Sequence, residues 1–160
     1  MTPAIKIAEK ARVYFNLFEY EHDSNAHSFG LEAAEFLASQ YNVIPEQVYK
    51  TLVVETSGKE LVVAIICVKE KLSMKNLAKA IGVKKAKMAT EENVLRSTGY
   101  VLGGVSPLGQ KNRLKTVIDE TAKQFDVVYV SAGKRGLEIA LSPKDLIELT
   151  NAREANIIAV

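Results

Sequence analysis

The sequence predicts an α+β fold, with a mixed, largely antiparallel sheet of six to seven strands and about five flanking helices. Runs of β-branched and aromatic residues alternate with helical segments along the 160 residues. Neighbouring strand candidates are often joined by tight turns instead of crossover helices, which favours antiparallel pairing. A hydrophobic content of 48% is enough for one sizeable core, so we expect a single domain over residues 1–160.

Most of the predicted helices begin after a hydroxyl side chain that can accept a hydrogen bond from a first-turn N–H group. Thr2, Ser73, Thr90 and Ser142 occupy that position, and proline follows two of them at the first helical residue. Short helical turns are expected near residues 45–48 and 121–125. The longer predicted helices cover residues 3–12, 31–40, 74–81, 91–98 and 144–151.

The strands are predicted from alternating or nearly continuous apolar residues. Residues 51–55 and 60–68 flank a Ser57-Gly58 turn, which indicates a central antiparallel hairpin. Cys67 lies inside this hairpin, and we expect a buried thiol there. The glycine-rich run over residues 100–105 is also expected to be extended. The remaining strand candidates are residues 13–20, 83–88, 114–120, 126–132 and 136–141.

Composition and charge exclude few functions. Lysine and arginine outnumber aspartate and glutamate by 21 to 19, a bias too small to require or exclude nucleic acid. No apolar run approaches the roughly 20 residues that a membrane helix needs. The first ten residues lack the apolar segment of a secretory signal, and the single cysteine cannot form an internal disulfide. We therefore expect a cytoplasmic protein that makes no membrane contact.

The stretch over residues 97–109 is the leading candidate for a functional site. It holds four of the nine glycines, and Gly103-Gly104 ahead of Ser106-Pro107 predicts exposed backbone beside a pocket. A tight turn between two strands is the alternative. The segment around Ser106 lacks the second glycine of G-x-S-x-G, and no histidine follows it, which disfavours a serine triad. No phosphate-binding P-loop is present.

Two other patterns stay open at this point. His22, Asp23 and His27 share one polar loop, but no third and fourth ligand completes a common zinc pattern, so we expect solvated histidines and no metal. Basic residues cluster at 84–87, 111–115 and 134–135. They form either ordinary solvated faces or, if they converge, a positive rim suited to a phosphate-bearing or RNA-borne substrate.

Three segments together resemble the YbaK family of aminoacyl-tRNA deacylases. They are YKTL at 49–52, STGYVLGGVSPLGQK at 97–111 and YVSAGKRGLEI at 129–139. The start MTPAI and the segment at 72–89 are similar to the bacterial Cys-tRNA(Pro) deacylase branch of that family. The resemblance implies a free-standing editing enzyme that cleaves the ester between cysteine and tRNA(Pro). Its implied partners are the acceptor end of the mischarged tRNA and prolyl-tRNA synthetase, and not DNA.

The resemblance also implies a set of site residues. Lys50 matches the lysine that is the main functional side chain of the family, where it would hold the terminal adenosine or its phosphate. Gly103 and Gly104 match glycines that line the substrate pocket, and their backbone amides would stabilise the developing oxyanion. Ser106 and Pro107 lie beside them in the same motif. The thiol of the substrate would attack its own ester, so the resemblance implies neither a cofactor nor a metal.

Two further substrate-binding residues are implied, with one departure from the pattern. Tyr20 at the end of the first strand and Ser131 match family positions, whereas Asn112 stands where relatives often carry a basic residue. A sister deacylase for alanine- or serine-charged tRNA is the nearest alternative. A non-catalytic module that binds RNA or the synthetase is the second.

Overall fold

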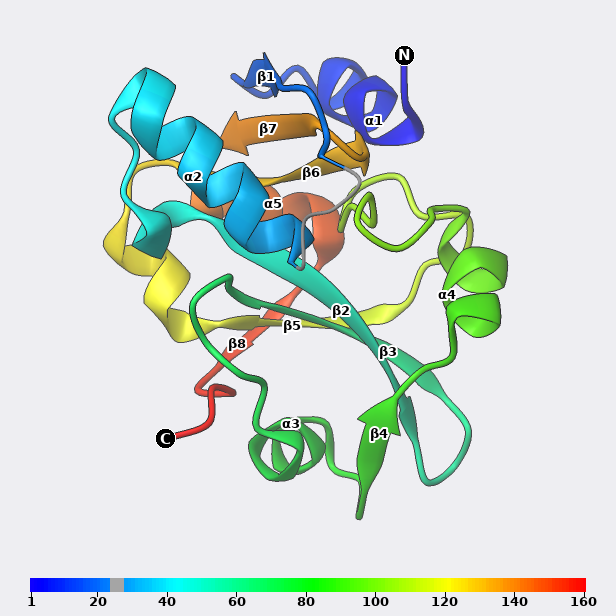
Figure 1. Cartoon of the computed structure of the whole chain (residues 1–160). Helices are drawn as coiled ribbons and strands as arrows, with labels where there is room; N and C mark the ends of the chain where they lie inside the picture. The colour runs from blue at the N-terminus through cyan, green and yellow to red at the C-terminus, as the bar shows by residue number, and fades with distance from the viewer. Residues whose placement is uncertain (24–27) are drawn as a thin grey trace.

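The computed structural model describes residues 1–23 and 28–160, which form five α-helices, two 3₁₀ helices and eight strands (Figure 1). The helices are α1 (Pro3–Ala11), α2 (Phe29–Tyr41), η1 (Pro45–Gln47), α3 (Met74–Ile81), α4 (Glu91–Thr98), η2 (Glu120–Gln124) and α5 (Pro143–Thr150). The strands are β1 (Asn16–Glu19), β2 (Tyr49–Thr56), β3 (Leu61–Cys67), β4 (Ala86–Met88), β5 (Lys115–Asp119), β6 (Val128–Lys134), β7 (Leu137–Leu141) and β8 (Arg153–Ala155).

The strands are divided between two sheets. A three-stranded antiparallel sheet has the order β1-β7-β6, and a five-stranded mixed sheet has the order β4-β2-β3-β5-β8. In the larger sheet β2 pairs with β3 and β4 antiparallel, whereas β5 runs parallel to both β3 and β8. A parallel bridge between Val48 and Tyr129 joins the two sheets. The α+β fold class and the central hairpin are confirmed, although the strands form two sheets and not one.

The helix starts follow the predicted chemistry. Thr2, Ser73, Thr90 and Ser142 each accept a hydrogen bond from the backbone N–H three residues later. Helix α2 begins two residues before the expected start, because Ser28 caps it in the same way. Among the described helices, none combines the length and the hydrophobicity that a bilayer crossing requires.

Two local predictions are wrong. The run at 100–105 is not a strand, because the Gly104 N–H donates to the Val101 carbonyl at 2.9 Å and closes a turn. Strand β8 was not predicted, since its sequence Arg-Glu-Ala carries none of the β-branched or aromatic residues typical of strands. It joins the sheet only through its pairing with β5.

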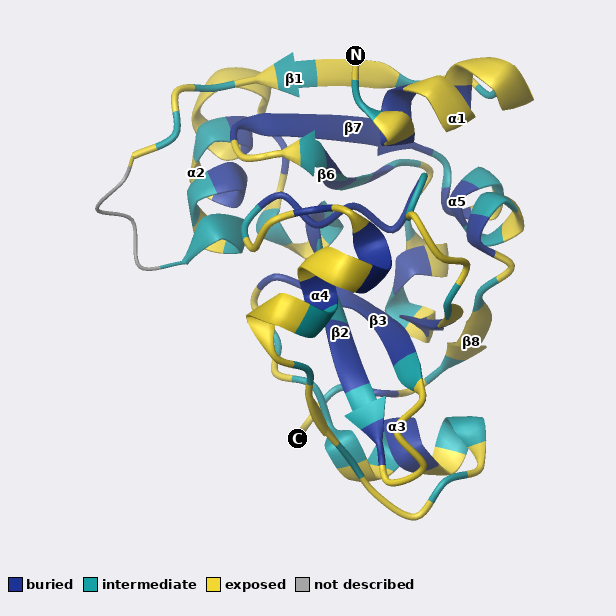
Figure 2. Cartoon of the chain, turned by 90° about the vertical axis from the view of Figure 1, so that its right-hand side faces the viewer, coloured by how far each residue is buried: buried dark blue, intermediate teal, exposed yellow. Residues whose placement is uncertain are grey.

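Three apolar clusters hold the elements together. The largest lies between the two sheets and takes in α1, and the second lies between the five-stranded sheet and α3. The third lies beneath α2, where Leu37 packs with Val48 and Val68. Figure 2 shows β7 and most of β3 as buried strands, whereas β2 is buried only in part. Cys67, only 6% exposed, belongs to the first cluster as expected, and burial raises the pKa of its thiol.

Candidate active site

A cavity of about 290 Å³ lies where α2, the first residues of β2, the glycine-rich loop and the three-stranded sheet meet. It is thus built from segments far apart in the sequence. Its lining residues are Ser28, Phe29, Gly30, Ala33, Val48, Tyr49, Lys50, Thr51, Leu52, Val68, Leu102, Gly103, Val105, Ser131 and Glu138.

Lys50 supplies the cationic group of this lining. It is the second residue of β2 and lies opposite Ile66 of β3. Partial burial lowers the pKa of its amino group, because desolvation disfavours the charged form, while Cys67 and Glu70 act in the opposite direction. Within residues 1–23 and 28–160, none of the ion pairs involves Lys50. Its ammonium donors therefore remain available to a ligand.

A buried hydrogen-bond chain fixes the start of β2 beside Lys50. The hydroxyls of Tyr49 and Thr121 lie 2.8 Å apart, and the Thr121 hydroxyl donates to Asp119 at 2.6 Å. Asp119 also accepts the Ile157 N–H at 3.0 Å. Because the Thr121 proton is directed at the carboxylate, the Tyr49 hydroxyl donates to Thr121. Burial raises the pKa of Tyr49 to about 12, which keeps this donor protonated.

The glycine-rich loop approaches the cavity at Gly103. Gly103 has φ +86°, and a Cβ there would lie 2.8 Å from the Phe29 ring and 2.9 Å from Arg135 Nε. At Gly104 a Cβ would instead meet the main chain of the β6–β7 turn at 3.0 Å. The Gly104 N–H is already bonded to Val101, whereas no backbone partner of the Gly103 N–H occurs among the described residues. Of the two glycines, only Gly103 lines the cavity and has an N–H that no described backbone carbonyl accepts.

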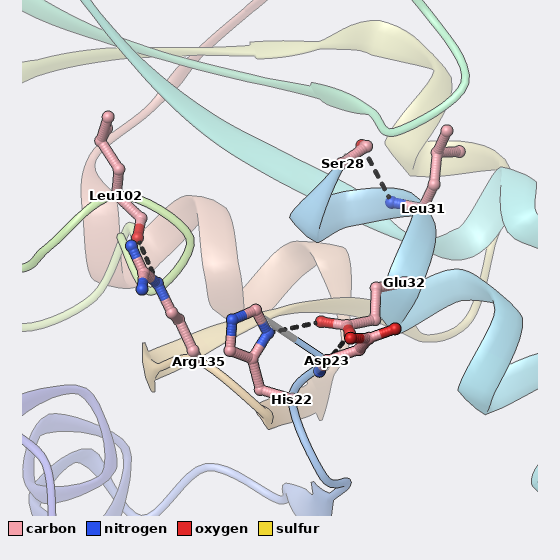
Figure 3. A network of polar contacts seen from close by, with 7 residues as sticks. All are labelled: His22, Asp23, Ser28, Leu31, Glu32, Leu102 and Arg135. Atoms are coloured by element: carbon pink, nitrogen blue, oxygen red, sulfur yellow. Dashed lines mark hydrogen bonds and ion pairs between the residues drawn. The ribbon is translucent and has the colours of Figure 1, made fainter. Parts of the chain in front are cut away.

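Polar side chains surround this loop and the first turns of α2, and Figure 3 shows the bond that Arg135 makes to the loop. Arg135, in the β6–β7 turn, donates through Nε to the Leu102 carbonyl at 2.8 Å, and its guanidinium lies 4.7 Å from the centre of the Phe29 ring. Glu32, one turn along α2 from Phe29, accepts from the Asp23 N–H at 2.7 Å and contacts His22 Nδ1 at 2.8 Å (Figure 3). The His22 ring in turn lies 5.5 Å from the Phe29 ring. The network ties the loop after β1, the first turns of α2 and the β6–β7 turn together.

The floor of the cavity comes from β6 and β7, through Ser131 and Glu138. These two residues lie directly opposite each other in the register. The Ser131 hydroxyl accepts the Gly133 N–H at 3.1 Å within an irregular part of the β6–β7 pairing. Glu138 is 6% exposed, and burial raises the pKa of its carboxyl from 4.5 to about 8. Sequence reasoning missed Glu138, although one acidic residue in the apolar run GLEIAL is a detectable signal.

The structure therefore brings Lys50, Gly103 and Ser131 to one cavity and leaves four other expected residues outside its lining. Gly104 is one of them, since it packs against the β6–β7 turn. Ser106 is fully buried, and its hydroxyl accepts the Leu108 N–H at 3.2 Å. Pro107 lines a separate depression with Asn112 and Arg113.

Tyr20 is the fourth of these residues, and it directly follows β1, where its N–H donates to the Gly136 carbonyl at 2.8 Å. Its ring stacks on Phe36 with centroids 5.1 Å apart. The pKa of its hydroxyl is raised, first by burial and then by the charges of Glu138 and Glu32. Tyr20 thus lies within electrostatic reach of the cavity without lining it.

The basic clusters do not all converge. Arg135 lies at the cavity, but Lys84 and Lys85 lie beside α3, which Figure 1 shows at the opposite end of the molecule from β7. His22 is not a solvated side chain, since it is 22% exposed and bonded to Glu32. His27 lies outside the described residues. No group of three or more metal-ligating side chains was found in the described ranges.

The described lining contains no histidine and no cysteine, and none of its hydroxyl groups is hydrogen-bonded to a lysine or a carboxylate that could activate it as a nucleophile. What it does contain is a cation, a buried carboxyl and backbone donors. Phe29 and Gly30 open α2, where first-turn N–H groups lack intrahelical partners. This arrangement is suited to holding and polarising a substrate.

Comparison with known proteins gives consistent results. The model of the aminoacyl-tRNA editing domain matches residues 30–149. EbsC of Enterococcus faecalis, provisionally named a Cys-tRNA(Pro)/Cys-tRNA(Cys) deacylase, is 35% identical over 156 residues, covering 98% of this chain and 92% of EbsC. A proline–tRNA ligase of Kosmotoga olearia is 32% identical over 108 residues, which cover 67% of this chain and 18% of the ligase.

Solved structures show the same fold. A crystal structure described, provisionally, as a trans-editing enzyme for prolyl tRNA synthetase superposes with a TM-score of 0.82 at 22% identity. The superposition covers 100% of this chain and 99% of that one.

Proposed function

The chain belongs to the family of aminoacyl-tRNA editing domains, and on that premise we propose that it removes cysteine from mischarged Cys-tRNA(Pro). Family membership makes the chain an aminoacyl-tRNA editing deacylase. The choice of cysteine and of tRNA(Pro) is supported by the name of the Enterococcus relative and by the domain shared with a proline–tRNA ligase.

The absence of a base-activated nucleophile from the described lining carries the mechanistic part of the proposal. An aminoacyl ester is already activated, and cysteine brings a nucleophile of its own. Its sulfur attacks the ester carbonyl carbon, the C–S bond forms, the C–O bond breaks, and the thiol proton passes to the departing ribose oxygen. The cysteine leaves as a cyclic thiolactone, which water then opens. Favourable placement of such an internal nucleophile can supply roughly 7 to 11 kcal/mol of the barrier.

The lining residues then have distinct tasks. We assign to the Gly103 N–H the stabilisation of the oxyanion that develops on the ester carbonyl, because Gly103 lines the cavity and no described backbone carbonyl accepts this N–H. Lys50 binds the terminal ribose or its phosphate as a point charge. A cavity of about 290 Å³ is at the lower end of ligand pockets, so it accepts the aminoacyl group while the rest of the adenosine stays at the mouth.

The test is a deacylation assay of the purified protein on tRNA(Pro) charged with cysteine, alanine, serine or proline. The mechanism requires rapid loss of the cysteinyl ester and little loss of the other three. Robust hydrolysis of Ala-tRNA(Pro) with little on Cys-tRNA(Pro) would overturn the choice of substrate. If the protein hydrolyses none of the four charged tRNAs, the result would favour the alternative of a non-catalytic binding module.

We also propose that prolyl-tRNA synthetase supplies the tRNA specificity. A domain of 160 residues with a formal net charge of +2 offers little surface for reading tRNA. A complex with the synthetase would raise the local concentration of the mischarged tRNA. We expect added synthetase to increase the rate on Cys-tRNA(Pro) and not on Cys-tRNA(Cys), and equal stimulation of both would contradict this partnership.

A further inference from the structure

Glu138 is a buried carboxyl group in the wall of the cavity, and the mechanism above gives it no task. On β7 it lies directly opposite Ser131 of β6 and Phe18 of β1, so these three side chains share one face of the sheet. The other face of β7 carries Leu137 and Ile139, which belong to the large core between the sheets. Glu138 therefore faces the cavity and not the main core.

No described residue neutralises this carboxyl. The hydrogen bonds and ion pairs formed by residues 1–23 and 28–160 do not include one to Glu138, and burial alone raises its pKa. Lys50 lines the same cavity, yet the acidic groups that act on the pKa of Lys50 are Cys67 and Glu70. The cation and the carboxyl of the cavity are thus not paired with each other.

A second polar group in the lining lacks a partner as well. Thr51 Oγ1 is buried and, within the described part of the chain, has no hydrogen bond. Burying a polar group without a partner is costly, and burying a carboxyl even more so. Two such groups in the wall of one cavity indicate a ligand that brings hydrogen-bond donors, and the carboxyl indicates a cationic one.

The proposed substrate carries one such group on its aminoacyl part. We propose that Glu138 binds the α-ammonium group of the aminoacyl ester, an inference that rests on the proposed function of the cavity. A primary ammonium offers three N–H donors, and its positive charge favours the ionised form of a carboxyl beside it. The bond between the ammonium and the resulting carboxylate is charge-assisted. Because the α-carbon joins the ammonium to the ester carbonyl, an ammonium held at Glu138 also fixes the carbonyl relative to Gly103.

The same contact bears on substrate choice. The amine of a prolyl ester is secondary and offers one donor fewer than that of a cysteinyl ester. Its nitrogen is also closed into the ring, which restricts how it meets the carboxylate. Glu138 therefore favours esters with a free primary amine, whatever their side chain, and the thiol requirement acts on top of this selection.

The experiment compares two thiol-containing substrates, Cys-tRNA(Pro) and 3-mercaptopropionyl-tRNA(Pro), which keeps the thiol and lacks the α-amino group. The kcat/KM of each is measured for the wild type, Glu138→Gln and the matched control Glu9→Gln, whose carboxylate is exposed on α1. We expect Glu138→Gln to lose about 10- to 150-fold on Cys-tRNA(Pro), as typical for a lost charge-assisted bond, and little on the deaminated substrate. Glu9→Gln should match the wild type on both.

The outcomes separate this inference from the proposed function. Equal losses on both substrates, or no loss on either, would overturn the ammonium contact while leaving the deacylase intact. If Glu138→Gln does not fold, the ammonium contact can be tested with the wild type alone. The measurement is then its affinity for non-hydrolysable amide analogues of cysteinyl-adenosine and 3-mercaptopropionyl-adenosine. Tighter binding of the cysteinyl analogue supports the contact, and equal binding refutes it. Binding of neither analogue, with no hydrolysis of either ester, would overturn both proposals.

Discussion

Replacing Gly103 with alanine tests whether the glycine-rich loop must approach the cavity as closely as the structure shows. A Cβ at this position would lie 2.8 Å from two atoms of the Phe29 ring and 2.9 Å from Arg135 Nε. Gly103 also has φ +86°, where an alanine is strained. The matched control is Gly82→Ala at the end of α3, where φ is +77° and no atom lies within 4 Å of an added Cβ.

The expected losses of stability have two contributions, the strain of the backbone and the steric overlap of the added methyl group. Both substitutions carry the backbone strain of the left-handed region, about 1 kcal/mol. Gly103→Ala adds overpacking against an aromatic ring, typically about 1 to 3 kcal/mol. At roughly 2 to 4 °C per kcal/mol for a domain of this size, Gly82→Ala should lower Tm by about 3 °C and Gly103→Ala by about 4 to 16 °C.

The decisive measurement is activity at a temperature at which both variants are folded. The added methyl at Gly103 pushes the loop away from Phe29, so the oxyanion donor moves relative to the ester. We expect kcat/KM of Gly103→Ala to fall by about 100-fold, the loss typical of a removed oxyanion donor, and that of Gly82→Ala to stay at the wild-type value. Equal activity of the two variants would refute the assignment of Gly103 to the reaction.

Three further outcomes are expected. Lys50→Met removes a charge and keeps the apolar stem, so kcat/KM on Cys-tRNA(Pro) should fall by about 10- to 150-fold, with Lys6→Met on α1 as the unchanged control. Glu138 remains protonated up to about pH 8 in the folded protein and only to about pH 4.5 when unfolded. The wild type should therefore lose stability relative to Glu138→Gln as pH rises between these values, by roughly 2 to 5 kcal/mol in total, and parallel Tm curves from pH 5 to 8.5 would contradict the buried carboxyl. Ser106→Ala removes a turn hydrogen bond outside the cavity, so it should cost about 1 kcal/mol of unfolding free energy with kcat/KM unchanged, and a selective loss of activity would count against its structural assignment.

Much of the local structure could be predicted because its causes are local. A hydroxyl at the helix start and a glycine at the helix end act within one turn of backbone, which is why α3 was predicted from Ser73 to Gly82. The central hairpin was predicted for the same reason, since its two apolar strands are separated by a short turn. The division into two sheets depends instead on pairing between β1 and β7, which lie more than a hundred residues apart, and no local signal encodes that choice.

The site shows the same division between local and distant causes. Lys50 is one of many lysines, and only the resemblance of its motif to a known family singled it out. Gly103 was predicted from its glycine-rich context, but its role in shaping the cavity depends on Phe29 and Arg135, from other segments. Glu138 could be noticed as an acidic residue in an apolar strand. Its lack of a partner appears only once the surrounding elements are in place.

Two glycines let the main chain pack directly against side chains at the cavity, and this bears on how proline is excluded. A Cβ at Gly30 would lie 2.8 Å from Val68 Cγ1, so α2 can approach β3 this closely only with glycine there. At Gly103 the loop meets Phe29 in the same way. These close contacts limit the space for a substrate, yet shape alone separates similar side chains by only about 1 to 3 kcal/mol. A prolyl ester that did enter would still lack a thiol to attack its own carbonyl. On the proposed mechanism, discrimination would therefore combine the fit of the ester, the amine contact at Glu138 and the need for a thiol. A variant that widens the cavity should then admit larger esters without hydrolysing those that lack a nucleophile.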